Sequence, residues 1–197
     1  TGNQPIYNEE QTLWLVCAGA IFNYQELRNE LEGSGHKFYT LYDTEVIVHL
    51  YEQLGMELLL RLNGQFAFAL WDTKKKILIL ARDRFGVQPL HYTFHEKNFY
   101  FGSEIKSIFA IDKVPRAIDS IFATGEIPRA LDPLALEQIF TIWAPLPGST
   151  AFQNVSELRP GHFAIVSADS FAEKKYWDIP YCPHEDHLKE DPRELAA

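Results

Sequence analysis

The segment Leu15–Leu31, LVCAGAIFNYQELRNEL, holds the residues of this sequence that most directly suggest chemistry. An apolar, strand-like run leads into Ala18-Gly19-Ala20 and then into an amphipathic helical pattern. Glycine at such a junction lets the backbone approach a ligand closely, because no side chain obstructs the N–H group. Cys17 is a candidate nucleophile, since a cysteine thiolate is a strong attacking group. The segment therefore suggests a catalytic corner, either working or degenerate.

Composition limits the partners and the compartment. The chain has 197 residues, of which 46% are hydrophobic and 23% charged, as in one globular domain with or without a tail. Its net charge of −9 argues against a nucleic-acid partner, because phosphate binding needs a basic face. Two distant cysteines, Cys17 and Cys182, make no disulfide framework, which favours a reducing, cytoplasmic location.

The sequence predicts neither a membrane-spanning segment nor a signal peptide. No apolar run approaches the roughly 18 residues that a membrane helix needs, so no membrane partner is expected. The start, TGNQPIYNEEQ, has neither an initiator Met nor a signal-peptide pattern. We interpret the chain as a fragment whose beginning lies upstream.

A strand is predicted before the corner and two helices after it. Residues 12–17 predict a buried strand, and the spacing of apolar residues from Tyr24 predicts a helix that Asn23 caps and that Gly33 and Gly35 end. A second helix is predicted to begin at Asp43, where the aspartate is a natural N-cap, and to end at Gly55.

The rest of the chain alternates short strands with turns. The predicted strands cover residues 64–72, 75–83, 89–96 and 98–104, as one antiparallel meander, and later 161–168 and 174–179. Short helices are predicted at 104–110 and 132–143, the latter capped by Asp132. Such an order predicts an α+β fold. Residues 181–197 are polar and are predicted to be a linker.

Several motifs in order make the sequence resemble a known family. These are GAIFNYQELRNELEGSGHKFYTLYDTEVIVHLYEQLG, RLNGQFAFALWD, ARDRFGVQPLHY, FGSEIKSIFA, ALEQIFTIWAPLPGSTAFQNVSELRPGH and YWDIP. Together they resemble the N-terminal glutaminase domain of asparagine synthetases, a class II glutamine amidotransferase of the N-terminal-nucleophile hydrolase type. The resemblance covers about residues 2–180. It implies a four-layer αββα sandwich of antiparallel sheets flanked by helices, here expected to lack its N-terminal strands.

The resemblance assigns roles to the corner. It implies that a cysteine at the mature N-terminus attacks the side-chain amide of glutamine, and this nucleophile is absent from the chain. Gly19 aligns with the glycine whose N–H helps form the oxyanion hole, and Asp43 with an aspartate that binds the substrate α-amino group. Ala18 and Ala20 stand where the family has an oxyanion-hole Asn and a substrate-binding Glu, so both positions are degenerate. Cys17 aligns with an apolar position and is interpreted as a structural thiol.

The remaining polar motifs are interpreted as structural. Asp83, between Arg82 and Arg84, is predicted to hold the following turn by side-chain hydrogen bonds, with phosphate binding by the arginines as a weaker alternative. Cys182, His184 and His187 have a loosely zinc-like spacing but no fourth ligand. We therefore predict no metal site.

Two functions fit this interpretation. The first is the glutaminase domain of an asparagine-synthetase-like enzyme, with an incomplete hydrolytic site in this chain. The second is an inactive pseudo-glutaminase kept for structure, regulation or assembly of a synthetase that uses ammonia or another amine. The resemblance implies glutamine as substrate, a C-terminal synthetase domain that uses ATP and Mg²⁺, no cofactor in this chain, and compatibility with a homodimer.

Overall fold

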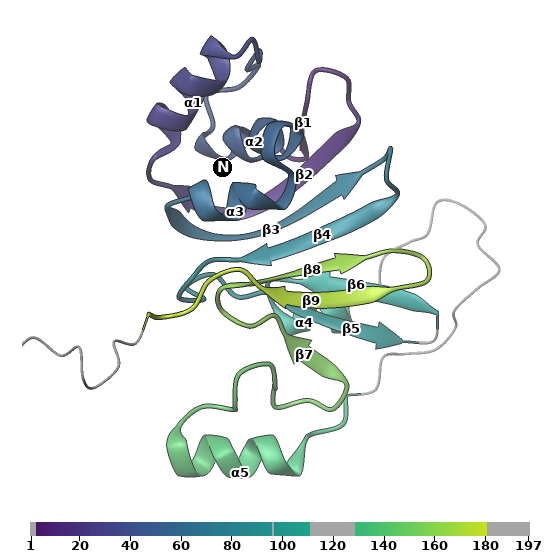
Figure 1. Cartoon of the computed structure of the whole chain (residues 1–197). Coiled ribbons are helices and arrows are strands. Elements are labelled where there is room, and N and C mark those ends of the chain that lie inside the picture. Colours follow the sequence, from purple (N-terminus) through teal and green to yellow (C-terminus); the bar gives the residue numbers. More distant parts are fainter. Residues whose placement is uncertain (1–2, 96, 111–128, 181–197) are drawn as a thin grey trace, which may run out of the picture.

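Two antiparallel β-sheets lie face to face in the computed structural model, which describes residues 3–95, 97–110 and 129–180 (Figure 1). Within these residues the larger sheet has the strand order β1-β2-β3-β4-β8-β9, and the smaller has β6-β5-β7. The larger sheet contains β1 (Ile6–Tyr7), β2 (Leu13–Ile21), β3 (Gly64–Asp72), β4 (Ile77–Arg82), β8 (His162–Val166) and β9 (Phe171–Lys175). The smaller contains β5 (His91–His95), β6 (Asn98–Gly102) and β7 (Val155–Glu157).

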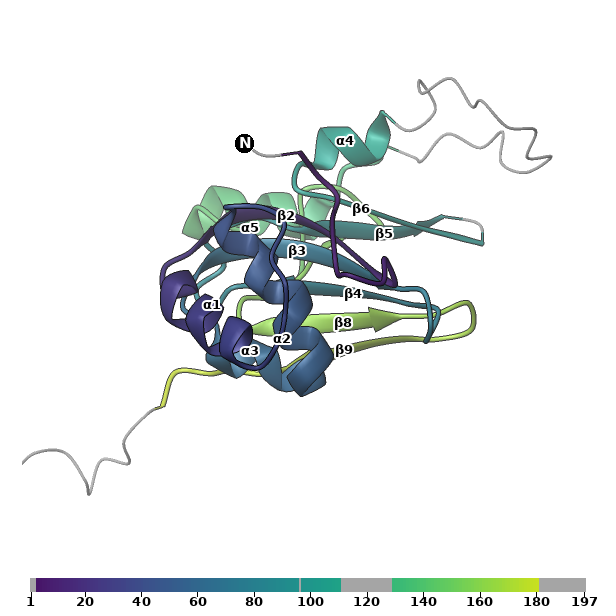
Figure 2. The same ribbon diagram turned by 90° about the horizontal axis from the view of Figure 1, so that it is seen from above.

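Helices cover the outer faces of both sheets. The described helices are α1 (Tyr24–Gly33), η1 (Asp43–Glu45), α2 (Val46–Leu54), η2 (Gly55–Glu57), α3 (Leu58–Arg61), α4 (Ile105–Phe109) and α5 (Pro133–Ile142). Figure 2 shows α1, α2 and α3 lying over the larger sheet. The short helix α4 packs on the far side of the smaller sheet through Ile108 and Phe109, which meet Val155 of β7. None of the described helices is both long enough and apolar enough to cross a bilayer.

The side-chain alternation of β3 explains the layering. Phe66, Phe68 and Leu70 point to the helical layer, where they join the largest core cluster. Ala67 and Ala69 point the other way, into the cluster between the sheets. Since successive side chains of a strand face opposite sides, a strand buried on both faces must be apolar throughout. Small residues on one face let the second sheet approach closely.

The structure confirms the α+β class with two antiparallel sheets and flanking helices. The prediction of a single antiparallel meander was wrong, because β3 and β4 belong to the larger sheet, whereas β5 and β6 belong to the smaller one. The turn after β4 carries the chain from one sheet to the other. Periodicity could not show this change, because it reports which residues alternate and not which strands pair.

Some predicted limits of strands and one predicted helix cap also differ from the structure. The last strand is β9, so the prediction at 174–179 was displaced, while the short strands β1 and β7 were not predicted. Asn23 stands at the start of α1 but makes no cap there. Its side chain instead donates to the carbonyl oxygen of Arg61 and accepts from the N–H of Asn63, each at 3.0 Å. The predicted linker, 181–197, lies outside the described residues, and the predicted domain boundary stays a prediction.

Candidate functional site

The candidate site forms where β2 runs past the end of β1. The two residues of β1 pair only with Trp14 and Leu15, so the outer edge of β2 has no strand partner beyond them among the described residues. Two side chains form hydrogen bonds with the backbone of this edge instead. Gln4 accepts from the N–H of Cys17 and donates to its carbonyl oxygen, both at 2.8 Å. Asp43 accepts from the N–H of Ile21 at 2.5 Å.

The contact to Ile21 replaces the predicted helix cap. Asp43 is the first residue of η1, and its carboxylate makes no cap hydrogen bond there. The carboxylate reaches 22 positions back along the chain, which no local capping rule anticipates. Capping as the role of Asp43 was therefore wrong, because the uncovered edge of β2 offers a buried N–H group that needs an acceptor.

Gly19 lies between these two anchored residues. Its φ of +119° is a conformation that other residues rarely adopt. A Cβ atom at this position would stand 2.0 Å from the carbonyl oxygen of Gln65 on β3. Since alternate residues of a strand direct their N–H groups to the same side, Gly19 shares the outward side with Cys17 and Ile21. The glycine is thus required by the backbone, whatever ligand the site takes.

A pocket of about 460 Å³ opens at this edge. Its lining combines the start of β1 and Gln4 before it, the middle of β2, and the start of η1 with the residue before it: Gln4, Ile6, Cys17, Ala18, Gly19, Tyr42, Asp43 and Thr44. The structure thus brings Gly19, Ala18 and Asp43 together, while Ala20 is outside the lining. A second cavity of about 230 Å³ between the sheets shares Gln4, Cys17 and Ala18 with the first. Gln4 is a pocket residue that sequence reasoning missed, because nothing in its local pattern indicates a partner on β2.

Cys17 is unsuited to act as the nucleophile of this pocket. Burial, and then the nearby carboxylate of Asp43, raise the pKa of the thiol to about 12. The reactive species is the thiolate, which is scarce near neutral pH at such a pKa. Its side chain also packs against the main core cluster. These contacts agree with the interpretation of Cys17 as a structural thiol.

The motif around Asp83 is structural, as predicted. Its two carboxylate oxygens accept from four backbone N–H groups: those of Phe66, Phe85, Val87 and Gln88, at 3.0–3.2 Å. The guanidinium of Arg82 donates to three carbonyl oxygens, of Gly86, Gln88 and Leu158, and pairs with Glu157 at 2.9 Å. These contacts leave Arg82 no role in binding phosphate, and that alternative was wrong for this residue.

Comparison with known proteins identifies the family of the chain that forms this site. The model of the glutamine amidotransferase domain family matches residues 1–177. The chain belongs to this family. Its resemblance to the N-terminal part of asparagine synthetases is confirmed by the relatives described next.

Relatives align along most of this chain but over a small part of their own. Asparagine synthetase (glutamine-hydrolyzing) 3 of Bacillus subtilis (strain 168) is 36% identical over 188 residues, which are 94% of this chain and 28% of that protein. Amidase chry2 of Gibberella zeae is 30% identical over 182 residues, 92% of this chain and 24% of that protein. This amidotransferase domain therefore corresponds to about a quarter of the length of these relatives.

A solved structure shares the fold. The glutamine phosphoribosylpyrophosphate amidotransferase from B. subtilis, complexed with ADP and GMP, superposes with a TM-score of 0.57 at 19% identity. The match covers 88% of this chain and 32% of that one. At this identity the likeness concerns the fold alone.

Proposed function

We propose that this amidotransferase domain binds glutamine in the pocket at Gly19 and Asp43 and serves an asparagine-synthetase-like enzyme. In this proposal the two sheets and their helices form the four-layer αββα sandwich of N-terminal-nucleophile hydrolases. The observation that carries it is the position of Asp43, whose carboxylate is fixed against β2 at the pocket that also contains Gly19.

The pocket offers two groups suited to glutamine. The Asp43 carboxylate can bind the α-ammonium group of an amino acid, because it uses one oxygen for Ile21 and accepts no other hydrogen bond from the described residues. The N–H of Gly19 can donate to the oxygen of a side-chain amide. These are the roles that the family resemblance implies for the two residues.

Two alanines weaken hydrolysis in this proposal. Ala18 lines the pocket with a methyl group and offers no side-chain donor. The loss of one oxyanion-hole donor typically costs about 2.7–4 kcal/mol in the transition state. Ala20 offers no carboxylate for the substrate. With Cys17 held as a thiol, attack on the amide requires a nucleophile from outside the described residues.

The alternative is a pseudo-glutaminase, which Ala18 and Ala20 favour directly. Both substitutions remove polar groups from one corner while the backbone of that corner keeps its shape. In this alternative the domain retains its fold for regulation or assembly, and the partner synthetase takes ammonia or another amine. Binding of glutamine without turnover would fit the alternative.

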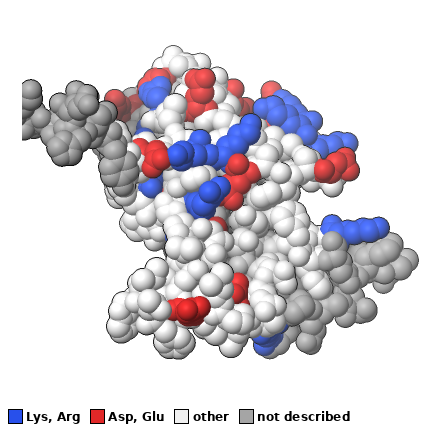
Figure 3. Space-filling model, turned by 60° about the horizontal axis from the view of Figure 1, so that its bottom comes forward, with Lys and Arg blue, Asp and Glu red and all other residues white. Residues whose placement is uncertain are grey.

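Helix α5 supports a contact with a further domain. Apolar side chains on and after this helix are exposed: Leu134, Phe140, Ile142, Trp143 and Leu146, with Trp143 at 92%. Figure 3, which brings the bottom of Figure 1 forward, shows few charged side chains in this part of the surface. Apolar patches of this kind mark interaction sites. We assign this surface to a C-terminal synthetase domain, for which ATP and Mg²⁺ would be the cofactors.

Binding of L-glutamine to the 197-residue chain tests the proposal. We expect binding by isothermal titration calorimetry and no release of ammonia in a coupled glutamate dehydrogenase assay. Asp43→Asn should weaken binding about 10- to 100-fold, because a charge-assisted hydrogen bond is lost. The matched control is Glu10→Gln, a carboxylate on the β1–β2 turn that pairs with Lys74 at the surface.

The outcomes test the pocket and the degeneracy of the hydrolytic site. Equal affinity in Asp43→Asn and the unsubstituted chain would refute the proposed pocket. Binding without ammonia release supports a degenerate site, and restoration by Ala18→Asn with Ala20→Glu should then increase affinity. Ammonia release by the unsubstituted chain would overturn the assignment of Ala18 and Ala20 as disabling.

A further inference from the structure

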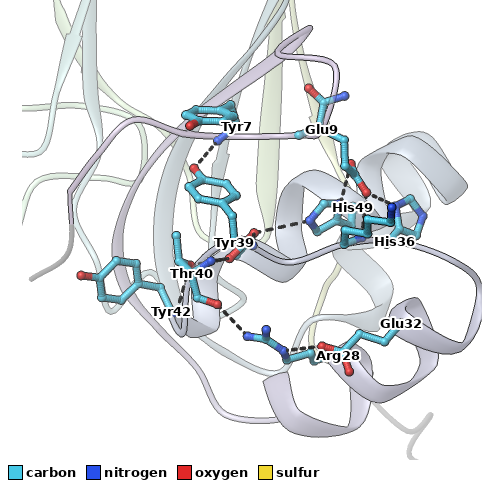
Figure 4. A network of polar contacts seen from close by, with 12 residues as sticks. Tyr7, Glu9, Arg28, Glu32, His36, Tyr39, Thr40, Tyr42 and His49 are labelled. Carbon is cyan, nitrogen blue, oxygen red and sulfur yellow. Dashed lines mark hydrogen bonds and ion pairs between the residues drawn. The ribbon is translucent and has the colours of Figure 1, made fainter.

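A second group of polar side chains gathers away from the pocket. Glu9 comes from the β1–β2 turn, His36 from the segment after α1, and His49 and Glu52 from one face of α2. One nitrogen or oxygen atom from each of the four lies within 4.8 Å of all the others. Figure 4 shows Glu9, His36 and His49 pointing toward one another. Three segments distant in sequence therefore converge on one point.

The separations are too long for hydrogen bonds. His49 Nδ1 lies 3.5 Å from Glu9 Oε2 and 3.5 Å from Glu52 Oε2. His36 Nδ1 lies 3.7 Å from Glu9 Oε1 and 3.7 Å from Glu52 Oε2. Charge-assisted hydrogen bonds would be about 2.7–2.9 Å. Ligand atoms about 2.0–2.2 Å from one tetrahedral ion are about 3.4 Å apart, close to these distances.

The imidazole of His49 needs an explanation. Its side chain is 0% exposed. Among the described residues, neither ring nitrogen has a hydrogen-bond partner. A buried, unpaired polar group costs free energy, and an ion is one of the few ways to satisfy it. Its Nδ1 is the atom that faces the two carboxylates.

The carboxylates are held in place from behind. Asn8, which is buried, donates to Glu52 Oε1 at 2.7 Å, so Oε2 is the oxygen left for the histidines. The N–H of Lys37 donates to Glu9 Oε1 at 2.8 Å. On the other side of His49, the buried carboxylate of Glu45 lies 3.7 Å from Nε2. Metal-binding histidines commonly donate the second ring N–H to a carboxylate, and Glu45 is the carboxylate on that side of His49, although at 3.7 Å it makes no hydrogen bond to Nε2.

We propose that Glu9, His36, His49 and Glu52 bind one divalent transition-metal ion, for which Zn²⁺ is the best fit. Two imidazole nitrogens and two carboxylate oxygens make a four-ligand set that suits Zn²⁺, whereas Mg²⁺ and Ca²⁺ prefer six or more oxygen ligands. The ion would be structural. It would join the β1–β2 turn, helix α2 and the segment that follows α1. None of these four residues lines the proposed glutamine pocket.

The ion would also brace the segment that carries Asp43. The chain runs from His36 to Tyr42, just before Asp43, without regular secondary structure, and Glu45 accepts from the N–H groups of Tyr39 and Thr40 at 2.8 Å. Coordination of the ion by His36 would fix the start of this segment, as the hydrogen bonds to Glu45 fix its middle. No metal site was predicted from the sequence, and residues 9, 36, 49 and 52 match no local ligand motif that could have indicated one.

Zinc titration of the chelator-treated 197-residue chain tests the site. The variant Cys182→Ser/His184→Ala/His187→Ala serves as the background, because these residues could bind zinc by themselves. We expect one Zn²⁺ per chain by elemental analysis after desalting. The thermal midpoint should rise by about 5–10 °C when free Zn²⁺ is 100-fold above its dissociation constant.

Variants at the accessible ligands test whether the ion is bound by the proposed residues. Glu9→Ala and His36→Ala should each weaken binding at least tenfold and abolish the visible absorption of the Co²⁺-substituted chain. Glu10→Ala, the neighbouring carboxylate, should change neither. His49→Ala is avoided because its fully buried ring contributes to packing. Absence of stoichiometric Zn²⁺, or equal binding in Glu9→Ala, His36→Ala and the control, would overturn the proposal and leave a buried histidine–carboxylate network.

Discussion

Two aspartates, Asp83 and Asp43, bind backbone N–H groups in two different corners of the molecule. Asp83 is 1% exposed and accepts from four N–H groups around the turn after β4. Asp43 is partly exposed and accepts from Ile21 alone among the described residues. The difference separates their functions. A carboxylate whose lone pairs are all used is structural, whereas one that faces a pocket with free lone pairs can bind a ligand.

The same substitution at both positions provides the strongest test of this comparison. Asp83→Asn places an NH₂ group against two of the four N–H donors, since each carboxylate oxygen accepts from two, and should cost about 3–5 kcal/mol of unfolding free energy. Urea denaturation, followed by circular dichroism, measures this cost. A loss below about 1 kcal/mol would show that the turn does not depend on the charge.

Gly19→Ala examines the backbone of the ligand-binding corner. The new Cβ would meet the carbonyl oxygen of Gln65 at an unfavourable φ, so we expect a loss of about 2–4 kcal/mol. Gly33→Ala is the matched control, because a Cβ there meets nothing within 4 Å and alanine favours a helix. Thermal unfolding should place the two variants on opposite sides of the unsubstituted chain. Equal stability of both variants would refute the close approach of β3.

Asp43→Asn should leave the fold nearly intact. The amide oxygen can still accept from Ile21, so a cost below about 1 kcal/mol is expected, against the much larger cost at Asp83. Comparison of the two urea midpoints gives the result directly. If Asp43→Asn destabilises the chain as much as Asp83→Asn, the carboxylate of Asp43 is structural too, and the contrast between the corners fails.

Cys17 gives the smallest effect on stability, and its main readout is the rate at which its thiol reacts. Because burial raises the pKa of its thiol to about 12, alkylation by iodoacetamide at pH 8 should be about 10³-fold slower than in urea. A Cys182→Ser background leaves Cys17 as the only thiol, and mass spectrometry follows the reaction. The folded state disfavours the thiolate, so its stability should fall as pH rises above about 9. Rapid labelling of the folded chain would instead make Cys17 a candidate nucleophile.

Much of the fold could be predicted from local pattern. The limits of β3 were predicted residue by residue, and α1, α4 and α5 lie where periodicity and turn residues placed them. Asp132 caps α5 through the N–H groups of Leu134 and Ala135, as expected of an aspartate before a proline. Such features depend on neighbours within a few residues, and a sequence displays those neighbours directly.

The candidate site was predictable in its members but not in its contacts. Family resemblance indicated Gly19 and Asp43, and the pocket contains both. The hydrogen bond from Ile21 to Asp43 and the two hydrogen bonds between Gln4 and Cys17 could not be predicted. Each depends on β1 being too short to cover β2, which is a property of strand pairing.

The sequence by itself determined the α+β class, the family and the absence of polar side chains at Ala18 and Ala20. These follow from residue identity and short-range periodicity. Tertiary structure alone decided that Gly19 must be a glycine, because the obstacle is Gln65 on a neighbouring strand. It also decided that Glu9, His36, His49 and Glu52 share one point. The physical reason is the same in both cases: contacts between distant segments are fixed only when the sheet and helices pack together.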